Sequence, residues 1–163
     1  MTTEFMRKFV DGIEPAFRQG DSSVDNKVAE TENVRVFREV CRAIERGDFA
    51  VVTDYFHHEV DLEITGPPGF PILGHWRGRD QVAAAVARNF AMLKNQRPEI
   101  RWLIAQGDTV VIVGHEEGLF VATEASYAVN WVQVYRFQDG RIAQLHEIVD
   151  GYSVADRESV ARA

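Results

Sequence analysis

The sequence has little of several features that define other protein classes. Cys41 is the only cysteine among 163 residues, which excludes a disulfide within the chain and a cysteine-based zinc cluster. No run of Lys and Arg exceeds a pair and the formal net charge is −7, which argues against a nucleic-acid partner. Apolar runs such as Val110–Val113 are far shorter than the roughly 20 residues that a membrane-spanning helix needs. We therefore expect neither nucleic acid nor membrane as a partner.

The composition is that of an ordinary globular protein. Apolar residues make up 45% of the chain and charged residues 26%, and 163 residues fit one domain. The first residues, Met1–Lys8, lack the apolar core of a signal peptide, so we expect a cytoplasmic protein. No Gly-x-Gly-x-x-Gly, Gly-Lys-Ser/Thr or Gly-x-Ser-x-Gly run occurs, so we predict no nucleotide cofactor and no serine-hydrolase chemistry.

Helical patterns dominate the first part of the chain. Residues 1–19 carry an apolar residue at every fourth position, which favours an amphipathic helix, and a hinge follows at Gly20. We interpret residues 1–25 as a helical appendage. A second helix is predicted over residues 26–46, and a short one over residues 49–56.

The remainder predicts strands. Residues 60–64 alternate with period two, residues 66–78 are a Pro- and Gly-rich loop, and residues 79–94 are helical. Four long strands then follow over residues 100–105, 109–123, 125–137 and 141–152, with a hairpin signal at Asp139-Gly140. Helices followed by an antiparallel meander define an α+β fold. We assign the main domain to residues 26–152 and a C-terminal tail to residues 153–163.

Two stretches resemble a known superfamily. One is Phe56-His-His-Glu-Val-Asp-Leu-Glu-Ile-Thr-Gly-Pro-Pro, followed by Gly74-His-Trp-Arg-Gly-Arg-Asp; the other is Trp131-Val-Gln-Val-Tyr-Arg-Phe-Gln-Asp-Gly-Arg-Ile, continuing through His146-Glu-Ile-Val-Asp. They resemble the nuclear transport factor 2-like superfamily, in its SnoaL-like group of polyketide cyclases, limonene-epoxide hydrolases and ketosteroid isomerases. The resemblance implies a curved antiparallel sheet wrapped around helices as a cone with an internal apolar pocket. It also implies a homodimer formed through the outer face of the sheet.

Three ionisable residues are the predicted catalytic set. Because side chains alternate along a strand, His115 and Glu117 share one face, and an inward Glu147 on the last strand would meet them. By resemblance to limonene-epoxide hydrolases, His115 replaces an Arg, and Glu117 and Glu147 replace two Asp residues. The alternative for His115 and Glu117 is a polar pair facing solvent or a dimer interface, and the alternative for Glu147 is an inward Asp150.

The first strand departs from the catalytic members of the superfamily. Leu62 and Ile64 stand where the hydrolases hold a water with Tyr and Asn, and Ile64 stands where ketosteroid isomerases have their Asp base. Neither reaction therefore carries over intact. The predicted substrate-binding residues are apolar, aromatic and amide side chains expected on inward faces or at the mouth: Leu62, Ile64, Trp76, Asn89, Leu93, Leu119, Val129, Trp131, Gln133 and Val149.

Two functions from different classes remain open. The first is a cofactor-independent enzyme acting on a small apolar, oxygenated molecule such as a polyketide, terpenoid or steroid-like compound, by isomerase- or cyclase-type proton transfer or, as a further alternative, by epoxide hydrolysis. The second is a non-catalytic module for binding a small ligand or for dimerisation. The histidines do not recur at ligand spacing, so we predict no metal site. His57 and His58 are interpreted as exposed residues at a helix end.

Overall fold

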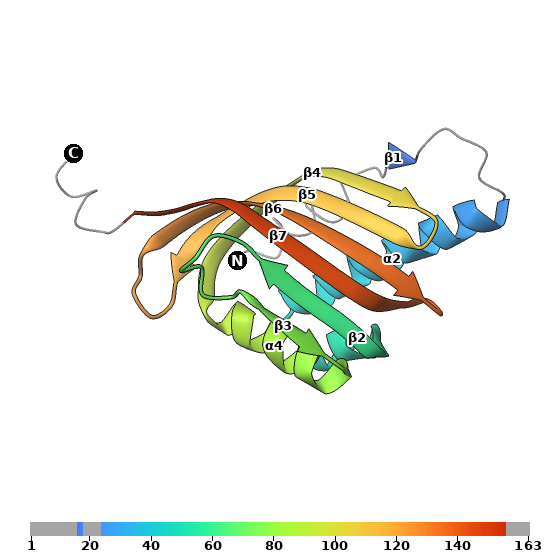
Figure 1. Cartoon of the computed structure of the whole chain (residues 1–163), viewed down its shortest axis with the longest axis horizontal. Helices are drawn as coiled ribbons and strands as arrows, with labels where there is room; N and C mark the ends of the chain where they lie inside the picture. The colour runs from blue at the N-terminus through green and yellow to red at the C-terminus, as the bar shows by residue number, and fades with distance from the viewer. Residues whose placement is uncertain (1–15, 18–23, 156–163) are drawn as a thin grey trace.

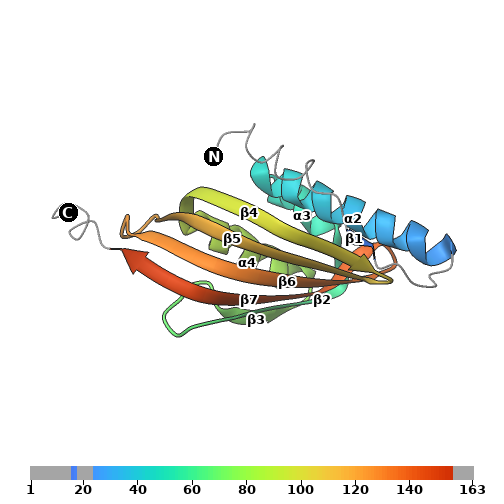
Figure 2. The same ribbon diagram turned by 90° about the horizontal axis from the view of Figure 1, so that it is seen from above.

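A curved sheet of seven strands and three helices make up the computed structural model, which describes residues 16–17 and 24–155 (Figure 1). Helices α2 (Val24–Glu45), α3 (Phe49–Asp54) and α4 (Arg79–Ala91) lie on one side of the sheet (Figure 2). The strands are β1 (Ala16–Phe17), β2 (Phe56–Thr65), β3 (Gly74–Arg77), β4 (Leu93–Gln106), β5 (Thr109–Phe120), β6 (Ser126–Gln138) and β7 (Arg141–Ala155). This arrangement confirms the predicted α+β class and the open, cone-like sheet.

The strand order in the sheet is β1-β4-β5-β6-β7-β2-β3. Strands β4 to β7 form the predicted antiparallel meander, but β2 pairs with β7 in parallel, as β1 does with β4. The sheet is therefore mixed rather than purely antiparallel. Strands β2 and β7 are far apart in sequence, and local sequence patterns do not specify the direction in which two such strands pair.

Turn and cap residues act where the sequence places them. Asp139 and Gly140 both have positive φ, 52° and 71°, as a two-residue hairpin loop with matching twist requires. Asp48 caps α3, because its Oδ1 accepts a hydrogen bond from the backbone N–H of Val51 at 3.2 Å. Gly47 ends the preceding helix with φ of 70°, a conformation that glycine adopts without strain.

Several predicted boundaries differ from the structure. Strand β4 begins at Leu93 and includes Pro98, where β4 pairs with β5 and no described strand pairs with its other edge, a position that tolerates proline. The predicted loop 66–78 contains β3, which pairs with β2. Helix α4 ends at Ala91 and α3 at Asp54, earlier than predicted. Strand β7 continues to Ala155, into the predicted tail.

The predicted N-terminal helix lies almost wholly outside the described residues. Ala16 and Phe17, which are described, form β1 beside β4 instead of continuing a helix, so that part of the prediction is wrong. The backbone hydrogen bonds of a strand edge hold these two residues extended.

The apolar core fills the space between the helices and the inner face of the sheet. Phe37 of α2, Val52 of α3, Val82 of α4 and Leu62 and Ile112 of the sheet are all buried. None of the described helices combines the length and apolarity needed to cross a bilayer. The core is open at its centre, where it surrounds a cavity.

Candidate active site

A cavity of about 170 Å³ lies between the inner face of the sheet and the helices. Apolar and aromatic side chains from α2, β2, α4 and β6 form most of its wall. The polar side chains in the lining are few: Asn89, Gln96, Glu116, Gln133, Tyr135 and Glu147. A largely apolar cavity with a few polar groups is the usual form of a small-molecule site.

Glu147 projects into this cavity from β7. Its Oε2 accepts a hydrogen bond from Gln133 Nε2 at 3.0 Å, and Gln133 Oε1 accepts one from the Tyr135 hydroxyl at 2.8 Å. Burial raises the pKa of Glu147 to about 7, with the bond from Gln133 opposing the rise and the charge of Glu116 adding to it. A carboxyl group with such a pKa both accepts and releases protons near neutral pH.

Glu116 of β5 is the second carboxyl group in the cavity. Its Oε1 accepts hydrogen bonds from the Tyr127 hydroxyl and, at 3.2 Å, from Gln96 Nε2. Burial raises the pKa of Glu116, while these two bonds and the nearby His115 oppose the rise. Burial and then the charge of Glu116 raise the pKa of Tyr127, so its hydroxyl remains a hydrogen-bond donor.

Most of the predicted pocket residues line the cavity. On the sheet, Glu147, Trp131 and Gln133 face inward as expected, and so do Leu62 and Ile64 of β2. The remaining predicted residues in the lining are Asn89, Leu93 and Val129. Cys41 also lies in the wall, and burial raises the pKa of its thiol to about 12.

The predicted orientation of His115 and Glu117 is wrong. Glu117 is exposed on the outer face of β5, where it pairs with Arg97 at 2.8 Å, and Arg97 lowers the pKa of its carboxyl group. His115 lies beside it, with Nε2 3.7 Å from Glu117 Oε1 and Nδ1 3.1 Å from Asn130 Oδ1. The inward residues of β5 are those of opposite parity, including Glu116. The predicted set of three therefore does not converge.

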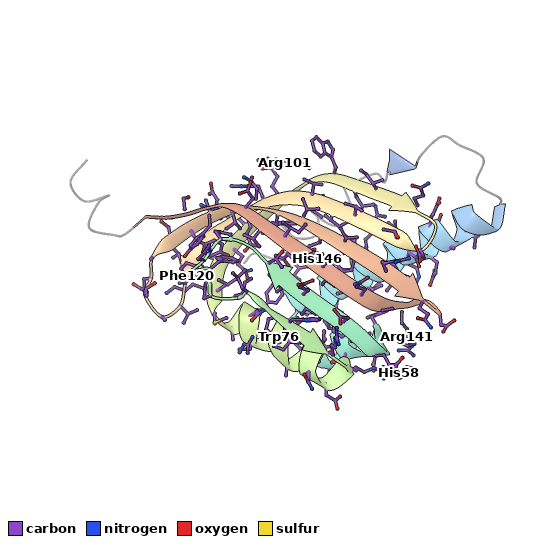
Figure 3. All side chains as sticks on the ribbon, in the orientation of Figure 1. His58, Trp76, Arg101, Phe120, Arg141 and His146 are labelled. Carbon is purple, nitrogen blue, oxygen red and sulfur yellow. The ribbon has the colours of Figure 1, made fainter. Side chains whose placement is uncertain are left out.

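Three predicted substrate-binding residues lie outside the cavity lining. Leu119 has the same outward parity as Glu117. Trp76 belongs to β3 and lies beside α4 (Figure 3), where the guanidinium carbon of Arg88 is 5.2 Å from the Trp76 ring centroid. Val149 faces inward but is buried in the core beyond the cavity wall.

Glu116 was missed because both faces of β5 are apolar along Val110–Val113. Alternation alone could not tell which face is inward. One signal was available: Gly114 lies mid-strand, where glycine often marks the close approach of another group. A Cβ atom there would lie 2.3 Å from Cζ2 of Trp131, so position 114 faces inward, toward Trp131. Glu116, two residues further along the strand, faces the same way.

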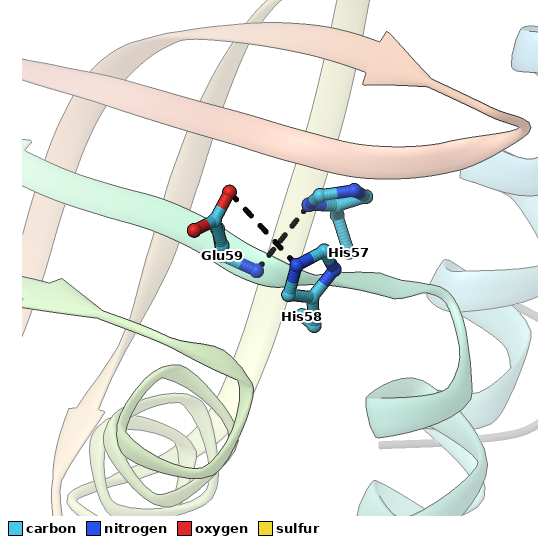
Figure 4. Close-up of side chains that lie close together, drawn as sticks. All are labelled: His57, His58 and Glu59. Carbon is cyan, nitrogen blue, oxygen red and sulfur yellow. Dashed lines mark hydrogen bonds and ion pairs between the residues drawn. The ribbon is translucent and has the colours of Figure 1, made fainter.

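A cluster of His57, His58 and Glu59 lies at the start of β2 (Figure 4). The two rings lie 4.2 Å apart because the pairing of β2 with β7 is irregular between Phe56 and Asp61. His57 is buried and lies in a strand, which corrects its prediction as an exposed residue at a helix end. The backbone N–H of Glu59 donates to His57 Nδ1 at 3.3 Å, so the lone pair of that nitrogen accepts a hydrogen bond instead of binding a metal ion. We assign no metal to it.

Comparison with protein families identifies the fold. The model of the SnoaL-like domain matches residues 37–145. The chain belongs to the SnoaL-like domain family. Comparison with curated proteins gives no match.

Solved structures similar to this SnoaL-like chain support the same fold. A nuclear transport factor 2-like protein from Burkholderia xenovorans is 22% identical, with 82% of this chain and 96% of that chain covered and a TM-score of 0.63. TerC, co-crystallised with polyporic acid, is 20% identical over 73% of this chain and 92% of that chain, with a TM-score of 0.60. A protein from Catenulispora acidiphila with a ketosteroid isomerase-like fold, in complex with trimethylamine, is 20% identical over 61% and 72%, with a TM-score of 0.51.

Proposed function

We propose that this SnoaL-like protein is an enzyme that moves a proton on a small apolar, oxygenated substrate, in an isomerase- or cyclase-type reaction. The observation that carries the proposal is Glu147, a carboxyl group that faces an apolar cavity and whose pKa is raised to about 7. Glu147 also belongs to the catalytic set predicted from the sequence. The partner carboxyl group is Glu116 rather than the predicted Glu117.

The reaction begins with the ionised form of Glu147. Its carboxylate takes a proton from a carbon next to a carbonyl group, and the C–H electron pair moves into an enolate. The carboxyl group of Glu147, whose acidic proton exchanges with solvent, then returns a proton to another carbon. Gln133 donates to Oε2 and is itself fixed by the Tyr135 hydroxyl, so the carboxylate keeps one orientation through both steps. The apolar wall limits direct protonation of the enolate by bulk water, so that Glu147 returns the proton.

Similar structures support the proposal that the cavity takes a small ligand. TerC was crystallised with polyporic acid, and the Catenulispora acidiphila protein with trimethylamine. Both are small organic molecules. They favour a small-molecule site without selecting the substrate.

The test is proton exchange into a simple probe. We expect the protein to accelerate deuterium incorporation next to the carbonyl of 1-tetralone in D₂O, followed by NMR. The rate should rise with pH through about 7 as Glu147 ionises, since the base form is the active one. Glu147→Gln should lower the rate about 100-fold or more. Glu117→Gln, on the outer face, is the matched control and should keep the rate.

The alternative function is a ligand-binding module. The observation that favours it is the apolar first strand, because Leu62 and Ile64 line the cavity and supply no hydrogen bond. Binding of ligands to the wild type and to Glu147→Gln with equal affinity, together with exchange at the solvent rate for a panel of ketones, would favour this module over an enzyme.

We also infer that the protein forms a homodimer through the outer face of its sheet. Trp102 and Ile148 are exposed, and the paired residues Trp102, Val113, Val132 and Ile148 form an apolar row across β4 to β7. Exposed apolar patches of this kind mark interfaces. Light scattering should give a dimer mass that Trp102→Lys lowers to that of a monomer. Val28→Lys, at an equally exposed valine of α2, should keep the dimer.

A further inference from the structure

The charged side chains that line the cavity are all acidic. Glu116 and Glu147 both face the cavity, and the described residues of its wall include no Lys, Arg or His. Two basic side chains near the wall point away from the cavity: Arg88 is exposed, stacks on Trp76 and donates to Asn89 Oδ1 at 3.3 Å, and His115 lies on the opposite face of β5. An anionic ligand would therefore meet repulsion and find no ion-pair partner among these residues.

The indole of Trp131 lies over β5, the strand that carries Glu116. Its ring covers Gly114, where a Cβ atom would lie 2.3 Å from Cζ2, and Gly114 is followed two residues later on the same face by Glu116. An aromatic face beside a carboxylate is a favourable environment for an ammonium group, because both the negative face of the ring and the carboxylate attract the positive charge.

Glu116 is held in place by donors on both sides. Tyr127 of β6 and Gln96 of β4 donate to its Oε1, and both residues are buried. Among the described residues, the carboxyl group of Glu147 accepts one side-chain hydrogen bond, from Gln133, and Glu147 lies on the far side of β6 from β5. The two carboxyl groups thus suit different tasks: a fixed anchor and a group that gains and loses a proton.

We propose that the substrate carries a basic nitrogen, whose ammonium group lies on Trp131 and pairs with Glu116, while Glu147 remains for proton transfer. This division of tasks rests on the proposed function, whereas the ammonium site itself does not. The substrate nitrogen also brings into the cavity a positive charge that offsets the enolate charge formed when Glu147 takes a proton. The ligand class is therefore a hydrophobic amine or quaternary ammonium compound.

The test compares a cation with its uncharged isostere. Phenyltrimethylammonium and tert-butylbenzene have nearly the same shape, and calorimetric titration at pH 8 measures the affinity of each. We expect the cation to bind at least tenfold more tightly than the isostere. Glu116→Gln should remove most of that difference, and Glu117→Gln, which changes the adjacent carboxyl group on the outer face, should leave it within twofold.

A pH series on the wild type needs no variant. The quaternary cation cannot lose a proton, so its affinity should fall as pH drops and Glu116 and Glu147 become protonated, while the affinity of tert-butylbenzene stays constant. Equal affinity for the two probes at pH 8, or a cation affinity independent of pH, would overturn the ammonium site. Preferred binding of the cation without deuterium exchange into any ketone or amino ketone would keep the site and refute the proposed enzyme.

Discussion

Ionisation of Glu147 should make the protein less stable as pH rises. The folded pKa of about 7 lies above the value of 4.5 for an exposed Glu, so the folded state binds the proton more tightly than the unfolded state does. Below pH 4.5 the group is protonated in both states and costs nothing. Between pH 4.5 and about 7 the carboxyl group ionises in the unfolded state but stays protonated in the folded state, so the free energy of unfolding falls as pH rises. Above pH 7 the group is ionised in both states and the loss is complete.

The size of this cost follows from the pKa. Each pH unit between the two pKa values corresponds to about 1.4 kcal/mol, which gives at most about 3 kcal/mol at pH 8. Water within the cavity would screen the charge of Glu147 and reduce this energetic cost. Glu147→Gln keeps the shape and the hydrogen bond with Gln133 and cannot ionise. Its free energy of unfolding, relative to the wild type, should therefore rise by up to about 3 kcal/mol between pH 4.5 and pH 8.

Urea unfolding at several pH values measures this difference. The control is Glu117→Gln: Arg97 lowers the pKa of that exposed carboxyl group, so its removal should give no stability gain at high pH. A constant difference between Glu147→Gln and the wild type from pH 4.5 to 8 would show that Glu147 ionises like an exposed carboxyl group. The reasoning for a buried base would then be refuted.

Three further substitutions test the packing and the orientation of the site. Gly114→Ala places a Cβ atom 2.3 Å from the Trp131 ring and should lower the free energy of unfolding by about 1–3 kcal/mol, measured in urea; an unchanged midpoint would contradict the close approach. Leu62→Ala removes a fully buried side chain and should cost about 2–5 kcal/mol, more than the same change at the partly exposed Leu119. Tyr135→Phe removes the hydroxyl that orients Gln133, so kcat for 1-tetralone exchange should fall about fivefold with KM nearly unchanged, as expected for one hydrogen bond; an unaltered kcat would exclude this positioning role.

The sequence predicted the elements that depend on local signals. The Asp139-Gly140 hairpin has the positive φ values that its residues favour, and the apolar faces of the helices pack inward. Trp131, Gln133 and Glu147 line the cavity, as the resemblance to the superfamily implied for β6 and β7. The hairpin and the apolar helix faces depend only on residues that are close in sequence, so local sequence patterns predict them.

The parts that failed depend on contacts between distant segments. Strand β5 carries valines on both faces, because its inner face meets the core and its outer face presents an apolar row, so alternation could not choose between Glu116 and Glu117. The parallel pairing of β2 with β7 likewise joins segments separated by most of the domain.

The sequence alone therefore determined the α+β class and the meander, and its resemblance to the superfamily indicated Glu147 as an inward residue while leaving Asp150 as an alternative. Only the tertiary structure decided which acid of β5 joins Glu147, because that choice is made by the ring of Trp131 lying over Gly114 and by the hydroxyl of Tyr127 reaching Glu116 from the next strand. A one-residue difference in parity moves a side chain from the cavity to the outer face, and packing across the sheet fixes it.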